Sequence, residues 1–167
     1  MSKLERFFRQ GNPENVMAHL AKIRKPEIVA MGLEHDSFQV KSYAQVLLNV
    51  INTPEAAAAV LKRLSHRDVY VRRAALSALN GMSRQVVARS AKIIARKMFT
   101  PFTRESEKED TAELLRKLGN PEVLPELREA EREMERIPFR RGAQDVVLLR
   151  IQKTIRALEE VERSQSG

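Results

Sequence analysis

The feature of this sequence that most constrains its fold is an internal repeat. Moving the segment 35-HDSFQVKSYAQVLLN-49 along the chain by 31 positions places it on 66-HRDVYVRRAALSALN-80. The equivalent pairs are His35 and His66, Val40 and Val71, Lys41 and Arg72, Ala44 and Ala75, Leu48 and Leu79, and Asn49 and Asn80. Apolar residues at intervals of four form one stripe on a helix. A unit of this length predicts a helical hairpin that buries its core only by stacking on its neighbours.

A recurring Pro-Glu pair marks the predicted starts of helices, and it begins at positions 13, 26, 54 and 121. In three of the four, a residue that can cap a helix precedes the proline: Asn12, Thr53 and Asn120. Proline suits the first helical position, and glutamate favours the positive end of the helix dipole. Gly11 and Gly119 stand one residue earlier, where a left-handed residue would end the preceding helix. The GNPE motif therefore predicts a stop, a tight turn and a new helix.

Between these marks the apolar spacing is helical. It predicts helices at about 2–10, 14–24, 26–34, 37–51, 54–64, 68–80, 84–98, 109–118, 121–136 and 143–162. No segment shows the sustained alternation of a strand. The chain is predicted to be all-α, an α-solenoid of about four stacked antiparallel helical hairpins with terminal helices. It is expected to form a single domain over 1–167, with irregular connectors near 99–108 and 137–142 and a frayed tail at 163–167.

These segments resemble HEAT repeats, in particular the short units called PBS-lyase-type HEAT-like repeats. The residues that carry the resemblance are 68-DVYVRRAALSAL-79 and the turn within 112-AELLRKLGNPEVLPEL-127. The resemblance covers about 36–98 and 109–136, and the segment 137-IPFRRG-142 interrupts it. It implies a curved helical scaffold whose inner surface binds another macromolecule.

The resemblance also implies a structural role for two of the basic residues. Lys41 and Arg72 occupy the position at which HEAT units place a base that bonds neighbouring loops. We therefore expect these two side chains to hold the repeats together rather than to contact a partner.

Positive charge is concentrated in the first part of the chain. The protein carries 30 Lys and Arg against 22 Asp and Glu, a net charge of +8. Ten bases but a single acid, Asp68, lie from Lys62 to Lys97. Such a surface attracts anionic partners without selecting one, although a solvated helix face is also often basic.

A row of cations is predicted on the helix at 84–98. Arg89, Lys92 and Arg96 are spaced three and four apart, so their charges project together, and such a row can follow an acidic helix or a phosphate backbone. The complete set of predicted partner-binding residues is Arg73, Arg84, Arg89, Lys92, Arg96, Lys97, Phe139, Arg140 and Arg141.

The aromatic residues weigh against a nucleic-acid site, because bases stack on exposed rings. There is no tryptophan, and both Tyr43 and Tyr70 are expected to pack within the repeat helices. Phe99, Phe102 and Phe139 lie in or beside the two irregular loops. They either fold back to cap the core, which we favour, or serve as anchors for a partner.

Several classes of site lack the residues they need. The chain has no cysteine and three histidines, and the equivalence of His35 with His66 indicates that each serves its own turn. No metal, cofactor or small-molecule substrate is indicated. Neither a signal peptide nor a membrane span is apparent, so no membrane association is expected, and a cytoplasmic location is expected.

These observations predict a non-enzymatic scaffold that binds an acidic or amphipathic protein through its basic central repeats. The alternative is a nucleic-acid-binding protein that contacts the phosphate backbone with the same face. A third class, which the resemblance suggests, is an enzyme similar to bilin lyases or to HEAT-like DNA glycosylases. No nucleophile or ligand cluster supports that class.

Overall fold

The computed structural model describes residues 3–137 and 142–166, and within these ranges the elements are helical with no strand. The prediction of an all-α protein is confirmed. The chain divides into two compact units, Met1–Val86 and Val87–Gly167. Each unit has its own buried apolar core.

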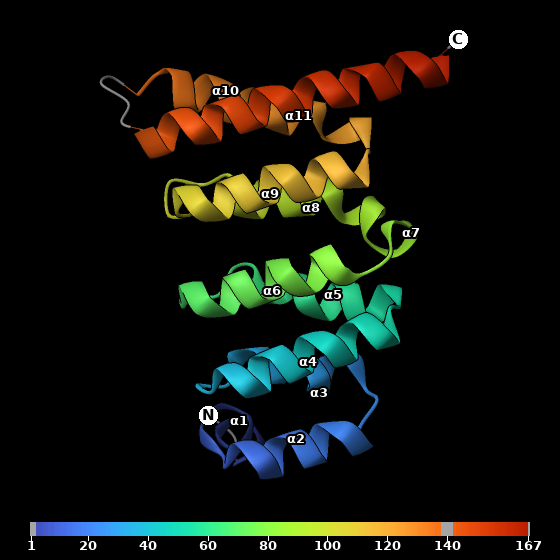
Figure 1. The fold of residues 1–167 in the computed structure, drawn as a ribbon, viewed down its shortest axis with the longest axis vertical. Coiled ribbons are helices and arrows are strands. Elements are labelled where there is room, and N and C mark those ends of the chain that lie inside the picture. The colour runs from blue at the N-terminus through green and yellow to red at the C-terminus, as the bar shows by residue number, and fades with distance from the viewer. Residues whose placement is uncertain (1–2, 138–141, 167) are drawn as a thin grey trace. The chain divides into compact units, whose positions relative to one another are not determined.

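The first unit is built from two rows of helices (Figure 1). Its elements are α1 (Lys3–Gln10), α2 (Pro13–Lys22), α3 (Pro26–Met31), the 3-10 turn η1 (Gly32–Glu34), α4 (Phe38–Ile51), α5 (Pro54–Arg63) and α6 (Val69–Gly81). Helix α4 packs between α2 and α6 in one row, while α3 and α5 pack together behind them. The rows are joined because α3 packs on α4 and α5 packs on α6.

The sequence repeat corresponds to equivalent positions in α4 and α6. The buried pairs in these helices are Val40 and Val71, Ala44 and Ala75, and Leu48 and Leu79. Leu33 of η1 and Leu64 at the end of α5 form a further buried pair before the two helices. Each pair places the same kind of side chain in the core between the two rows. The apolar stripe read from the sequence is therefore the buried face of both helices.

Three of the predicted helix caps form as expected. Asn12 Oδ1 accepts a hydrogen bond from the Glu14 backbone N–H at 3.0 Å, at the start of α2. Thr53 Oγ1 accepts from Ala56 N–H at 3.2 Å, and Asn120 Oδ1 accepts from Glu122 N–H at 3.0 Å. These side chains satisfy N–H groups that a helix leaves without an internal partner.

The two GNPE turns differ in their glycines. Gly119 is left-handed, with φ 57°, as predicted. Gly11 is not left-handed, so that part of the prediction is wrong. Its need for glycine is spatial, because a Cβ there would lie 2.4 Å from the Phe7 carbonyl oxygen. The other left-handed residue in the described chain is Asn52, with φ 44°, which ends α4 without a glycine.

The second unit repeats the two-row arrangement (Figure 1). Its elements are the end of α7 (Arg84–Val87), η2 (Ala88–Ser90), α8 (Ala91–Met98), α9 (Glu105–Leu118), η3 (Pro121–Val123), α10 (Leu124–Glu135) and α11 (Gly142–Ser166). Helix α11 packs on both α9 and α10, and α8 packs on both α9 and α10.

The predicted helix at 84–98 is not continuous. A 3-10 turn, η2, separates α7 from α8. The carbonyl of Ala88 accepts both the Ala91 N–H and the Asn120 side-chain amide, the latter at 3.0 Å. A side chain that inserts into the helical ladder in this way is a recognised cause of a break. Because Asn120 is distant in sequence, local spacing could not reveal it.

Two other boundaries differ from the prediction. Helix α9 begins at Glu105, so residues 105–108 are helical and not part of the connector. The Glu107 carboxylate accepts from the Arg104 N–H at 3.1 Å, and acids in a first turn favour the helix dipole. Helix α11 continues through Ser166, whereas the sequence predicts fraying from 163. The connector at 137–142 lies mostly outside the described residues.

Candidate functional site

The predicted partner-binding residues are distributed over both units. Arg73 lies on α6 and Arg84 at the start of α7, in the first unit. Arg89, Lys92, Arg96 and Lys97 belong to η2 and α8 in the second. Phe139, Arg140 and Arg141 lie outside the described residues. The structure thus brings together one part of the predicted set, the row on η2 and α8.

This row is partly neutralised by α10. Arg96 forms an ion pair with Glu126, with Nη2 at 2.9 Å from Oε1. Because the Arg96 side chain is 70% exposed, the pair adds little stability, but it holds the guanidinium against α10. Arg89 is exposed and Lys92 half-buried, and neither has an ion-pair partner within the described chain. Two free cations therefore remain on this face.

Lys41 and Arg72 bond backbone carbonyls and so have a structural role, but these carbonyls belong to the loop before their own helix, whereas the resemblance implies bonds between neighbouring loops. Arg72 Nη1 donates to the carbonyl oxygens of His66 at 2.9 Å and Arg67 at 3.0 Å. Lys41 Nζ donates to the equivalent carbonyl of His35 and also to that of Asp36. Each base thus holds the loop that directly precedes its own helix.

The two equivalent histidines also make the same turn. His35 Nδ1 accepts from Ser37 N–H at 2.8 Å, and His66 Nδ1 accepts from Asp68 N–H at 3.1 Å. Their other ring nitrogens differ, since His35 Nε2 lies 2.9 Å from the Gly11 carbonyl. His66 Nε2 lies 3.0 Å from Arg9 Nη2. The interpretation that each histidine serves its own turn is confirmed.

In the described part of the chain, no group of three or more His, Asp or Glu is placed to hold a metal ion. None of its helices combines the length and the apolar character that a membrane crossing requires.

Two aromatic predictions are wrong. Tyr70 was expected to pack, but it is 68% exposed on α6. Phe102 was expected to cap the core, but it is 91% exposed in the loop before α9. The repeat could have predicted the exposure of Tyr70, because the equivalent position in α4 holds Gln39, a polar residue. A position that holds glutamine in one unit faces solvent in both.

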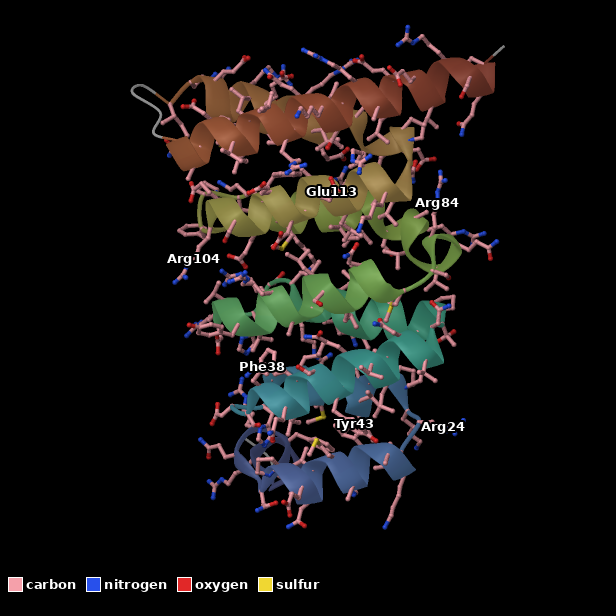
Figure 2. The ribbon with its side chains drawn as sticks, viewed as in Figure 1. Arg24, Phe38, Tyr43, Arg84, Arg104 and Glu113 are labelled. Carbon is pink, nitrogen blue, oxygen red and sulfur yellow. The ribbon has the colours of Figure 1, made fainter. Side chains whose placement is uncertain are left out.

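The structure reveals an exposed surface that the sequence reasoning missed, which we call the α4–α6 face. Its residues are Phe38, Val46 and Val50 of α4 and Tyr70, Arg73 and Ser77 of α6. Phe38 and Val50 are 79% and 75% exposed, and Figure 2 labels Phe38 at the start of α4. Ser77 Oγ donates to Gln45 Oε1 at 3.1 Å, which links the two helices at their outer side.

Arg73 supplies an available charge to the α4–α6 face. It is exposed, and it has no ion-pair partner in the part of the chain that the structure describes. On helix α6 it stands three residues after Tyr70, so the ring and the guanidinium share one side. The face thus combines large apolar side chains with one unpaired cation.

No protein-family model matches the chain, and neither a curated protein nor a solved structure is significantly similar to it. Its function is therefore inferred from the geometry of its own surface.

Proposed function

We propose that this chain is a non-enzymatic, HEAT-like helical-repeat scaffold that binds an acidic, amphipathic protein. The observation that carries the proposal is the α4–α6 face, where exposed Phe38, Val50 and Tyr70 accompany the unpaired Arg73. Large apolar side chains exposed on two packed helices favour an interaction site, and aromatic and arginine side chains contribute most to binding at protein interfaces.

The HEAT-like assignment is supported by the equivalence of the two central repeats. Arg72 and Lys41 bond the same carbonyl of equivalent loops, and His66 and His35 make the same turn. The helices of the second unit also pack in two rows, so the proposal applies to each of the two units. Exposed residues in such repeats are free to vary because the buried stripe holds the fold.

The composition of the face indicates an amphipathic partner. Burying one large apolar side chain stabilises an interface by roughly 1.5–3 kcal/mol before the cost of association. Covering Phe38, Val50 and Tyr70 therefore supplies the larger part of the affinity. Arg73 then favours an acidic group at one end, which sets the orientation of the partner.

The test begins with affinity purification of the tagged chain from its native cell and mass spectrometry of what it retains. The decisive step compares a Tyr70→Ser, Arg73→Glu variant with the control Arg24→Glu, an exposed base at the end of α2. We expect the double variant to release a stoichiometric protein partner and the control to retain it. Retention of the partner by both variants would refute binding at the α4–α6 face.

A second candidate function, nucleic-acid binding, is favoured by one observation. Tyr70 is exposed with Arg67 and Arg73 three residues to either side, and an exposed ring between cations suits base stacking. Fluorescence anisotropy with single-stranded and duplex DNA over a salt series tests it. Binding that falls with salt and weakens in Tyr70→Leu supports this candidate, and no binding at low salt rejects it.

A further inference from the structure

A second surface feature lies in the other unit, in a groove between α9 and α11. Its lining consists of Glu113, Arg116, Arg150, Lys153, Arg156, Ala157 and Glu160, and its volume is about 460 Å³. Figure 2 labels Glu113 on α9. None of these residues belongs to the predicted basic row or to the α4–α6 face.

An ion-pair network fixes one side of the groove. Arg116 donates to both carboxylate oxygens of Glu113, at 2.7 Å and 3.1 Å. Arg150 Nη2 lies 3.1 Å from Glu109 Oε1, and Arg150 Nη1 lies 3.7 Å from Glu113 Oε2. The hydrogen bond from Arg116 lowers the pKa of the Glu113 carboxyl, although burial opposes the shift. The two arginines and two glutamates of this network, from α9 and α11, balance one another in charge.

Further along α11, Lys153 and Arg156 carry positive charge into the groove lining, and Glu160 follows with the opposite charge. Lys153 and Arg156 are exposed, and neither has a hydrogen-bond or ion-pair partner among the described residues. They stand three residues apart, so their charges project from the same side of the helix. Of the residues that line the groove, these two are the cations available to an incoming anion.

Apolar side chains continue the same side of α11. Val146 and Leu149 are 47% and 51% exposed. Val146, Leu149, Lys153 and Arg156 follow one another at intervals of three, four and three, the spacing of a single helix face. We call these four residues the α11 stripe. It changes from apolar to basic along its length.

We propose that the α9–α11 groove and the α11 stripe dock a protein segment that carries acidic side chains next to apolar ones. Apolar side chains of the segment cover Val146 and Leu149, and its carboxylates pair with Lys153 and Arg156. Charge complementarity identifies this occupant, because the two cations are unpaired where they meet exposed apolar surface.

Other occupants fit the groove less well. Glu113 and Glu160 interrupt the positive charge of the lining, whereas a phosphate backbone needs a continuous positive track. Two copies that paired through α11 with Lys153 at the centre would bring like cations together. The proposal does not depend on the α4–α6 face, so either site can fail without the other.

The experiment uses the 167-residue chain and a fluorescein-labelled synthetic helical peptide. Two leucines and two glutamates in the peptide repeat the spacing of the α11 stripe, and a second peptide has glutamines in place of the glutamates. The test variant is Lys153→Glu, Arg156→Glu. The matched control is Arg24→Glu, Lys25→Glu, which makes the same change in net charge at exposed positions of the first unit.

We expect saturable binding of the glutamate peptide that weakens at least about tenfold, or about 1.4 kcal/mol, in the test variant but not in the control. A peptide with lysines in place of the glutamates should bind the test variant better than the native chain, which a misfolded variant would not do. Equal loss in both variants, or no saturable binding to the native chain, overturns the proposal. Displacement of the peptide by inorganic phosphate or DNA also overturns the proposal. So does a dimer of the native chain that the substitutions in the test variant disrupt.

Discussion

Arg63 provides the sharpest test of how the first unit is held together. Its side chain is 9% exposed, and Nε lies 3.1 Å from Glu34 Oε1. Its Nη1 lies 3.2 Å from Glu27 Oε1 and donates to the Ala59 carbonyl at 2.9 Å. One guanidinium therefore connects α5 with α3 and η1. Replacing Arg63 by methionine keeps most of the side-chain length and leaves both carboxylates without this partner.

The expected loss follows from burial. Removing one partner of a wholly buried ion pair costs roughly 3–5 kcal/mol. Here the cost is smaller, because Glu34 is 22% exposed and retains Arg9 at 3.4 Å, while Glu27 is 54% exposed. We therefore expect Arg63→Met to lower the free energy of unfolding of the first unit by about 2–3 kcal/mol. With typical urea slopes, that is a shift of about 1 M in the midpoint.

The chain supplies its own selective probe for this measurement. It has no tryptophan, and its two tyrosines, Tyr43 and Tyr70, both lie in the first unit. Tyrosine fluorescence in a urea titration thus reports the unfolding of that unit, while circular dichroism reports helix loss in both. A separation of the two transitions in the variant would show that the units unfold independently.

The adjacent residue is the matched control. Lys62 pairs with the same Glu27 at 3.3 Å, but its side chain is 68% exposed. Lys62→Met should change the free energy of unfolding by less than about 1 kcal/mol. Adding Glu34→Met to Arg63→Met should restore part of the stability, because it removes the carboxylate left without Arg63. Equal effects of the Arg63 and Lys62 substitutions would refute the reasoning.

Two further predictions concern pH and packing. Burial raises the pKa of Glu27, but hydrogen bonds and charge from Arg63 and Lys62 outweigh it and lower the pKa overall. The resulting stability is present above the ordinary glutamate pKa and is lost as the pH falls through the lower pKa of the folded state. At pH values below about 4, the urea concentration at the unfolding midpoint should therefore decrease, and it should decrease less in Glu27→Gln. Gly32→Ala should destabilise the first unit by roughly 1–3 kcal/mol in the same titration, because its Cβ would lie 2.9 Å from side chains of Ala44 and Leu20. Gly142→Ala, which meets nothing within 4 Å, should be neutral or slightly stabilising by circular dichroism.

The parts of the fold that local chemistry determines could be predicted from the sequence. The caps at Asn12, Thr53 and Asn120 depend on bonds to residues two or three positions away, and all three form. The structural role of Lys41 and Arg72 was predicted from the repeat and a resemblance, but their printed bonds are local ones, to a loop five or six residues back.

Contacts between distant segments could not be predicted. Asn120 reaches back 32 positions to the carbonyl of Ala88, at the break between α7 and α8. Glu126 reaches Arg96 across 30 positions and removes it from the row of free cations. The exposure of Tyr70 is an intermediate case, because comparing it with its repeat partner Gln39 would have revealed it.

The loop bonds of the central repeats have a consequence for how such a chain can change length. Arg72 bonds His66 and Arg67, and His66 bonds Asp68, so the loop and the start of its helix are specified within a few residues. A block of 31 residues bounded at equivalent loop positions therefore contains the residues that form its own turn and helix start. Duplicating or deleting that block leaves these bonds intact on both sides of the junction. The contacts that define the turn and the helix start of a central repeat are therefore contained within the repeat itself.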